Sequence, residues 1–165
     1  MHHSDFLETM AKIYKPNLYI ELGLYEGETW NKVRKYCKNS IGVDIVDKNL
    51  DGNIFIGKTD DFFLNLKDKA DMIFIDADHN FESAKKDLIN SLNFLNDGGI
   101  IIMHDTDPED NKLFSSGYCG DSYRIVQLIE DNFDNLNIVT IPIAEAGLSI
   151  ITKKKSTRTF LRNNA

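Results

Sequence analysis

The feature that most constrains the fold of this chain is a short apolar segment that leads directly into an amphipathic one. Residues 71–75 read Asp-Met-Ile-Phe-Ile, a nearly unbroken apolar run that is typical of a parallel strand buried on both faces. In residues 81–95, apolar side chains recur at helical spacing. Asn80 can cap this helix, and we expect the glycine pair 98–99 to end it. A buried strand followed by a crossover helix indicates an α/β fold with a parallel sheet.

The same alternation extends over the rest of the chain. The sequence predicts helices at residues 4–14, 29–37, 81–95 and 122–133. It predicts seven strands, at residues 17–22, 40–45, 53–57, 70–76, 99–103, 136–141 and 147–153. Few residues separate the second and third strands, so the helix usual there is expected to be missing or reduced to a turn. The last two strands have a short connection and should be antiparallel neighbours. The predicted fold is a Rossmann-like, doubly wound α/β sheet, mostly parallel, with an antiparallel last strand.

We expect one domain that spans residues 1–165, because a chain of this length can bury a single core. Within it we expect an N-terminal helical segment at 1–16, a lid loop at 106–121 and a tail at 153–165. Long connections without secondary structure often serve as lids or binding loops. The loop is therefore a candidate for substrate contacts, and disorder is the alternative.

Charge and composition exclude several classes of protein. The formal net charge is −7, which gives a nucleic-acid partner no electrostatic help. No apolar run approaches the roughly 18 residues that a membrane span needs, and we see no signal peptide. Cys37 and Cys119 form no Cys-x-x-Cys pair and suit free thiols in a reducing cytoplasm. His2 and His3 are interpreted as a frayed end or a tag remnant rather than as a weak ligand pair.

Glycines and an acidic residue follow the first predicted strand, at the place where doubly wound sheets bind ligands. Glu21 ends the strand, and Gly23 and Gly27 allow the backbone to turn tightly and to approach a ligand. The helix expected from Thr29 would point its free N–H groups toward that ligand. A plain strand–helix turn is the alternative. Position 25 is tyrosine, so the Gly-x-Gly-x-x-Gly dinucleotide fingerprint is absent.

Polar residues after the second and third strands suit an adenosine group. Asp44 ends the second strand and can accept both hydroxyls of a ribose, although it can also be a solvated turn residue. Thr59, Asp60 and Asp61 follow the third strand, and one of them can hold an adenine amino group. A helix cap is the alternative for each of these three. Together, the three strand-end features favour an adenosine-type ligand.

Ionisable groups gather at the end of the fourth strand. Asp76, Asp78 and His79 fall within four positions, and Asp105 follows the fifth strand. Neighbouring strands lie about 4.8 Å apart, so Asp76 and Asp105 can reach one ion. Oxygen ligands favour Mg²⁺ or Ca²⁺, and Asp78 is either a third ligand or a capping residue. His104 should project from the opposite side of its strand, and a packed or cofactor-facing side chain is favoured over the alternative of a ligand.

Three stretches of the sequence resemble one enzyme family. They are ELGLYEGET at 21–29, DMIFIDADHNF at 71–81 and GGIIIMHD at 98–105. In this order they are similar to motifs of the class I S-adenosylmethionine-dependent methyltransferases, over about residues 17–151. Within the family they resemble the catechol-type O-methyltransferases, and they are more similar still to the small group that includes sugar O-methyltransferases and cephalosporin-hydroxylase-like members. It implies an enzyme that binds S-adenosyl-L-methionine.

The resemblance implies a role at each matching position around the cofactor. The residues that would contact S-adenosyl-L-methionine are Glu21, Gly23, Tyr25, Gly27, Asp44, Thr59, Asp60 and Asp76. The loop after the first strand would line the methionine end of the cofactor. Asp44 would bind the ribose, and Thr59 with Asp60 would bind the adenine.

The resemblance also implies catalytic roles. Asp76 and Asp105 fall where the metal-dependent members place ligands of Mg²⁺, which would lower the pKa of a substrate hydroxyl. His79 stands where catechol-type enzymes carry a lysine general base, and an imidazole with a reference pKa of about 6.5 suits that task. A metal or neighbouring ligand and a structural histidine are the alternatives for His79. The pattern has asparagine where this chain has Thr106, so a third metal ligand stays open.

The implied reaction is S_N2 methyl transfer to a small hydroxylated molecule such as a sugar, for which the protein mainly aligns the reactants. Tyr118, Cys119 and Arg124 are candidate substrate contacts. The N-terminal extension is short, which motivates the hypothesis that a homodimer completes the pocket. A non-catalytic cofactor-binding module is the second functional hypothesis. A nicotinamide-linked oxidoreductase is the third, and the missing glycine fingerprint disfavours it.

Overall fold

The computed structural model describes residues 2–115, 117–143 and 146–155, so most of the expected tail lies outside the described residues. Its strands are β1 Leu18–Leu22, β2 Asn39–Asp44, β3 Ile54–Ile56, β4 Ala70–Ile75, β5 Leu95–His104, β6 Leu136–Ile141 and β7 Leu148–Lys153. Its helices are α1 His3–Tyr14, α2 Glu28–Val33, α3 Thr59–Asn65, α4 Phe81–Asn93 and α5 Arg124–Asn132, with 3₁₀ turns η1 Arg34–Tyr36 and η2 Asn111–Phe114.

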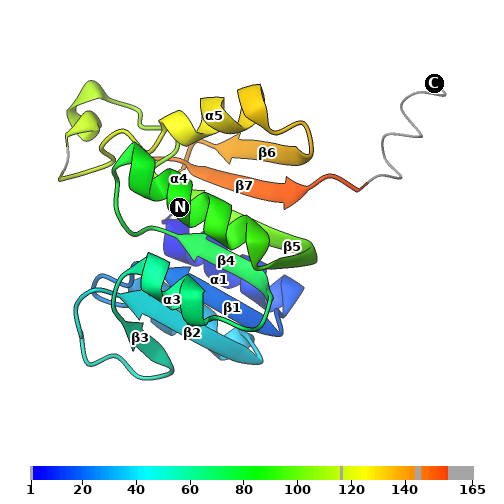
Figure 1. Cartoon of the computed structure of the whole chain (residues 1–165). Coiled ribbons are helices and arrows are strands. Elements are labelled where there is room, and N and C mark those ends of the chain that lie inside the picture. The colour runs from blue at the N-terminus through cyan, green and yellow to red at the C-terminus, as the bar shows by residue number, and fades with distance from the viewer. Residues whose placement is uncertain (1, 116, 144–145, 156–165) are drawn as a thin grey trace.

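The seven strands form one sheet in the order β3-β2-β1-β4-β5-β7-β6 (Figure 1). Pairing is parallel from β3 through β5, whereas β7 runs antiparallel to both β5 and β6. No helix separates β2 from β3, as expected. The predicted Rossmann-like sheet with an antiparallel last strand is therefore confirmed.

Helices cover both faces of the sheet (Figure 1). On one face, α3, α4 and α5 pack through a cluster that includes Phe63, Leu88 and Ile129. On the other face, α1 and α2 pack through a cluster that includes Leu7 and Trp30. The two clusters take alternate residues of each central strand, because successive side chains of a strand point to opposite faces. This explains why the central strands are apolar at nearly every position.

The order of the strands reverses direction between β1 and β4. The chain moves outward from β1 to β2 and β3, then returns to place β4 on the other side of β1. At such a switch point the connections leave the carboxyl ends of the strands in opposite directions and open a crevice, where ligands of doubly wound sheets bind. The residues after β1 and β4 therefore face a common space.

Two local expectations were wrong. The pair Gly98 and Gly99 lies inside β5 and does not end α4, which stops at Asn93. Gly98 has a φ of 82° and lies where the pairing of β4 with β5 shifts register, so the glycines serve an irregularity in the strand. Helix α3 was also missed, because it has only seven residues and its two aspartates were interpreted as adenine contacts or helix caps.

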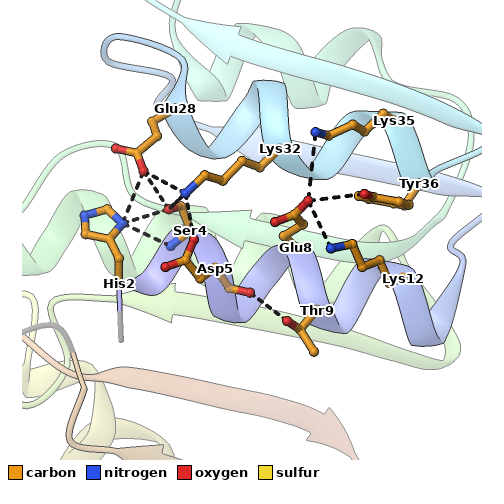
Figure 2. A network of polar contacts seen from close by, with 10 residues as sticks. All are labelled: His2, Ser4, Asp5, Glu8, Thr9, Lys12, Glu28, Lys32, Lys35 and Tyr36. Carbon is orange, nitrogen blue, oxygen red and sulfur yellow. Dashed lines mark hydrogen bonds and ion pairs between the residues drawn. The ribbon is translucent and has the colours of Figure 1, made fainter.

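The N-terminal segment is ordered by a polar network with α2 rather than frayed (Figure 2). His2 is the N-cap of α1, with its Nδ1 accepting a hydrogen bond from the amide of Ser4. The Ser4 hydroxyl donates to Glu28 Oε1 at 2.9 Å, and Lys32 Nζ lies 2.7 Å from Asp5 Oδ1. Each exposed pair contributes little alone, but the network fixes how the start of α1 lies against α2. The prediction of a frayed end is therefore wrong.

Candidate functional site

A cavity of about 1240 Å³ opens at the carboxyl edge of the sheet. Of the residues predicted to bind a cofactor or a metal, those that line it are Glu21, Gly23, Tyr25, Asp44, Thr59, Asp60, Asp76, His79 and Asp105. Ligand pockets commonly measure about 300–1,000 Å³, so the cavity can hold a nucleoside cofactor together with a small second molecule.

Gly23 lets the loop after β1 pass close to the end of β4. Its φ is 85°, a left-handed conformation, and a Cβ at this position would overlap the carbonyl oxygen of Asp76. The amide of Gly23 also donates to the carbonyl of Val43, at 2.9 Å. The absence of a side chain is therefore needed to bring the ends of β1, β2 and β4 together at the cavity.

Gly27 is not among the residues that line the cavity, although Glu26 and Glu28 on either side of it are. It is the N-cap of α2 with a φ of 77°, and a Cβ there would lie 2.6 Å from the side chain of Leu50. Glycine is needed at position 27 because the backbone is left-handed and the packing is close. A ligand contact would select glycine as well, so the sequence alone does not distinguish the two reasons.

Asp44 holds the loop after β1 in place. Its Oδ2 accepts hydrogen bonds from the amides of Leu24 at 2.9 Å and Tyr25 at 3.2 Å. Its Oδ1 accepts from the amide of Val46 at 2.9 Å. The carboxylate lines the cavity while doing so. This position suits contact with ribose hydroxyls, which can join the existing donors around the two oxygens.

A buried aspartate that sequence reasoning missed lies near Thr59 and Asp60 in the lining of the cavity. Asp87, in α4, is only 3% exposed and lines the cavity. Burial raises the pKa of its carboxyl to about 6. The signal was present in the sequence, because Asp87 falls between Ala84 and Leu88 on the inward face of its helix, where a charged residue is rare unless it has a role.

Asp76, His79 and Asp105 converge, as predicted from the ends of β4 and β5. One oxygen or nitrogen from each of the three side chains lies within 4.8 Å of the others. His79 Nε2 is 3.1 Å from Asp105 Oδ2 and 3.7 Å from Asp76 Oδ1. Asp105 is nearly buried, with a side-chain exposure of 7%. The two carboxylates therefore face one another across an imidazole at the cavity wall.

His104 joins this cluster, so the expectation that it projects from the opposite side of the strand was wrong. Its Nδ1 donates toward Asp76 Oδ1 at 3.3 Å and lies 3.2 Å from Asp105 Oδ1. The cause is the backbone of Asp105, whose φ of 60° ends the alternation that a regular strand would impose. Aspartate tolerates this left-handed conformation better than most residues. His3 packs over His104, with ring centroids 4.2 Å apart.

The carboxylates and imidazoles shift each other's pKa values. Burial by itself would raise the pKa of Asp76, but the imidazoles of His104 and His79 beside it outweigh burial and hold that pKa well below its ordinary value. The nearby carboxylate of Asp76, with the charge of Asp105, raises the pKa of His79 to about 9. Burial lowers the pKa of His3 to about 4. The neighbouring carboxylates thus favour the protonated form of His79.

The remaining predicted residues divide between the cavity and its surroundings. Tyr118 and Cys119 line the cavity. Arg124 instead pairs with Asp121 at 3.0 Å and lies over a phenylalanine ring, away from the lining. Asp78 also lines the cavity, but it is outside the ligand cluster found among the described residues. Its Oδ1 accepts from the amide of Asn80 at 3.1 Å, in the turn before the helix, and Asn80 rather than Asp78 is the N-cap of α4.

Glu21 is a fully buried acid at the base of the cavity. It is 1% exposed, and the hydroxyl of Tyr19 donates to its Oε2 at 2.6 Å. Burial, with the charge of Asp76 nearby, raises the pKa of Glu21 to about 8. The folded state therefore holds a proton that the unfolded chain releases near its ordinary pKa of 4.5. The contribution of Glu21 to the free energy of unfolding is therefore fully present below pH 4.5 and is lost as the pH rises toward 8.

We expect Glu21→Gln to unfold at higher denaturant concentration than the wild type in alkaline solution. The glutamine can still accept the Tyr19 hydrogen bond, but it never acquires the buried charge. The gain in free energy of unfolding should exceed about 1.4 kcal/mol, the equivalent of one pKa unit, near pH 9 and nearly vanish near pH 4. Urea titrations at both pH values measure it. Glu130→Gln, at an exposed position of α5, is the control, and an equal gain in both variants would contradict the assignment.

The fold and the site together define a Rossmann-like methyltransferase. The chain matches the family model described as a methyltransferase domain over residues 20–106, which is more than half of its length. The protein belongs to this methyltransferase family, and its resemblance to class I S-adenosylmethionine-dependent methyltransferases is confirmed. A comparison with curated proteins found no significant match.

Solved structures of methyltransferases share the fold at low sequence identity. An O-methyltransferase from Bacillus cereus in complex with SAH (S-adenosylhomocysteine) has 14% identity and a TM-score of 0.75, covering 92% of this chain and 80% of that chain. The SAH-bound methyltransferase PaMTH1 from Podospora anserina has 16% identity and a TM-score of 0.72, covering 93% and 78%. TomG from Streptomyces achromogenes, an O-methyltransferase involved in tomaymycin synthesis and in complex with SAM, has 12% identity and a TM-score of 0.69, covering 93% and 80%.

None of the helices in the described part of the chain combines the length and the apolarity that a membrane crossing requires.

Proposed function

We propose that this protein transfers a methyl group from S-adenosylmethionine to a hydroxyl group of a small molecule, with the help of a divalent cation. The observation that carries the proposal is the convergence of Asp76 and Asp105 on the wall of a cavity that can hold a nucleoside cofactor. The Bacillus cereus O-methyltransferase is in complex with SAH, and TomG is in complex with SAM, which supports the same cofactor here.

The cavity offers a distinct partner to each part of the cofactor. Asp44 would accept hydrogen bonds from the ribose hydroxyls, and Thr59 with Asp60 would contact the adenine. The loop at Gly23 approaches closely enough for backbone contacts to the methionine end, beside Glu21. When bound, S-adenosylmethionine supplies an electrophilic methyl carbon. The work of the protein is then to align the acceptor oxygen with that carbon and to exclude water.

The donor set at the ends of β4 and β5 fits a divalent cation. Asp76 and Asp105 provide two carboxylates around a common point, and carboxylate oxygens are donors that divalent cations bind. The N–H of His104 orients both carboxylates. A cation held by Asp76 and Asp105 would lower the pKa of a substrate hydroxyl in contact with it. The proposed function does not depend on whether His79 is a base or a ligand.

We propose that the loop 106–121 is a lid over the part of the cavity where the methyl acceptor binds. Leu113, Tyr118 and Cys119 of this loop line the cavity, and Tyr118 is 61% exposed, so it is free to contact a bound molecule. The sequence after β4 is Asp-Ala-Asp-His and lacks the [DN]PP[YF] motif of amino-methylating enzymes, which favours oxygen as the acceptor. A small polyhydroxylated compound such as a sugar fits these features.

Titration calorimetry with S-adenosylmethionine and with NAD tests the cofactor assignment. We expect saturable binding of S-adenosylmethionine and of SAH, and none of NAD. The loaded protein should then methylate at least one member of a panel of sugars and phenols, as mass spectrometry would show. Binding without methylation of any acceptor would favour a non-catalytic module, and binding of NAD alone would overturn the assignment.

Sedimentation of the same samples tests the proposed homodimer, which a monomer at working concentration would exclude.

A further inference from the structure

We infer that His79 is the third ligand of the cation rather than a general base, and that this nitrogen donor selects a first-row transition metal such as Zn²⁺ or Co²⁺ over Mg²⁺. The inference rests on the proposed function only in placing a cation between Asp76 and Asp105. It concerns the identity of that cation and the role of His79, which the methyl-transfer proposal leaves open.

The first support is where the imidazole points. His79 Nε2 lies 3.1 Å from Asp105 Oδ2 and 3.7 Å from Asp76 Oδ1. The nitrogen and the two carboxylates can therefore contact the same ion. The donor atoms of all three residues lie within 4.8 Å of one another, as donors around a single ion would. A general base would instead need its free nitrogen directed at the acceptor hydroxyl.

The second support is the partner of the other ring nitrogen. His79 Nδ1 contacts the backbone carbonyl oxygen of Tyr118. A carbonyl can only accept, so Nδ1 carries the hydrogen and, in the neutral ring, Nε2 carries the lone pair. Metal-binding histidines almost always donate their second N–H to a carbonyl or carboxylate, which fixes the tautomer and the orientation of the ring. The Tyr118 carbonyl is therefore in the place that a ligand histidine requires.

The third support is a rigid backbone around His79. The amide of Asp121 donates to the carbonyl of His79 at 3.1 Å, and Asp121 Oδ1 accepts from the amide of Phe81 at 2.6 Å. Gly120 has a φ of 54°, and a Cβ there would overlap the His79 carbonyl oxygen. The loop thus contacts the backbone at both ends of the segment 79–81. Such contacts hold the His79 side chain in one geometry, as a metal ligand requires.

The chemistry of the three donors decides which cations fit. Mg²⁺ prefers oxygen ligands in a near-octahedral arrangement and keeps several waters. Imidazole nitrogen suits zinc, copper, iron and nickel, and affinities of mixed nitrogen and oxygen sites rise along the first-row series. Two carboxylates with one neutral imidazole also balance the charge of a divalent ion. The Mg²⁺ expected from the resemblance is thus the poorer match for this chain's own residues.

Calorimetric titration of metal-free protein with Zn²⁺, Co²⁺ and Mg²⁺ tests the inference, without any methyl transfer. We expect Zn²⁺ and Co²⁺ to bind at least about 100-fold more tightly than Mg²⁺, in accordance with the ligand preferences. His79→Gln should weaken Zn²⁺ and Co²⁺ binding by at least about tenfold and leave Mg²⁺ binding nearly unchanged. Glu82→Gln is the control, because it removes an exposed side chain near His79 and keeps the three proposed ligands.

A second measurement uses the wild type alone and so does not depend on whether a variant folds. In the Co²⁺-loaded protein, proton NMR should show a paramagnetically shifted, exchangeable N–H signal from the Nδ1 of a coordinated imidazole. Absence of that signal, or Mg²⁺ binding as tight as Zn²⁺ binding, would overturn the inference. Titration with S-adenosylmethionine on the same samples separates the two proposals, because retained cofactor binding with a preference for Mg²⁺ refutes only the role of His79.

Discussion

Replacing Gly23 with alanine is expected to unfold or rearrange the cofactor end of the site. The new Cβ would overlap the carbonyl oxygen of Asp76, and the residue would remain at a φ of 85°. Strained left-handed backbone costs about 1–3 kcal/mol for a non-glycine residue, and a clash with main-chain atoms adds to it. We expect Gly23→Ala to lose more than about 3 kcal/mol in free energy of unfolding. Any folded fraction should bind S-adenosylmethionine poorly, because the loop after β1 must move away from β4.

Gly98→Ala is the matched control for this prediction. Gly98 has nearly the same φ, 82°, but a Cβ there meets no atom within 4 Å. Its substitution should therefore cost only the conformational part, about 1–2 kcal/mol, and leave cofactor binding intact. Chemical denaturation measures both costs, and titration calorimetry measures binding. Equal losses in the two variants would show that the close approach of the loop to β4 is not what requires glycine at position 23.

Asp105→Asn should remove most of the methyl-transfer activity while the protein still binds its cofactor. Asparagine keeps the size of the side chain and also tolerates the left-handed backbone at this position, so the fold should persist. One carboxylate of the proposed cation site is lost, and with it the assistance to deprotonation of the acceptor. We expect kcat/KM to fall by at least about 100-fold, equivalent to about 2.7 kcal/mol of transition-state stabilisation. The affinity for S-adenosylmethionine should stay within a few-fold of the wild type.

The response of activity to divalent cations, compared between the wild type and Asp105→Asn, tests whether Asp105 belongs to the ion site. In the wild type, removal of divalent cations with a chelator should depress activity, and their return should restore it. In Asp105→Asn both responses should be lost. Asp107→Asn, two residues further on at an exposed position, should behave as the wild type. An Asp105→Asn protein that still responds to cation would remove Asp105 from the ion site, and full activity without cation would refute metal assistance altogether.

The sheet could be predicted from the sequence because its buried strands have a distinctive apolar pattern. A strand such as β4 is buried on both faces, so nearly all of its residues are apolar, whereas α4 shows clear helical spacing. Elements that depend on tertiary context were less visible. Helix α3 is too short for its period to be distinctive, and the glycines in β5 serve a change of register that only the pairing with β4 reveals.

The candidate site could be predicted to the extent that it follows the ends of strands. Asp76 and Asp105 were expected to meet because β4 and β5 are neighbours, and they do. The positions of His104 and Asp87 could not be derived in this way. The first depends on one left-handed residue at the end of β5, which aspartate permits but does not demand. The second depends on which face of α4 borders the cavity.

The packing of the His3 ring against His104 has a practical consequence for experiments on the proposed cation site. The rings lie 4.2 Å apart, so a peptide fused before residue 2 would start close to the cavity mouth. A polyhistidine leader of the kind used on immobilised-nickel columns would bring competing imidazoles to that mouth and could deliver or withdraw ions. Fusing the affinity handle to the other end, or cleaving it before dialysis, would keep the stoichiometry of bound metal interpretable.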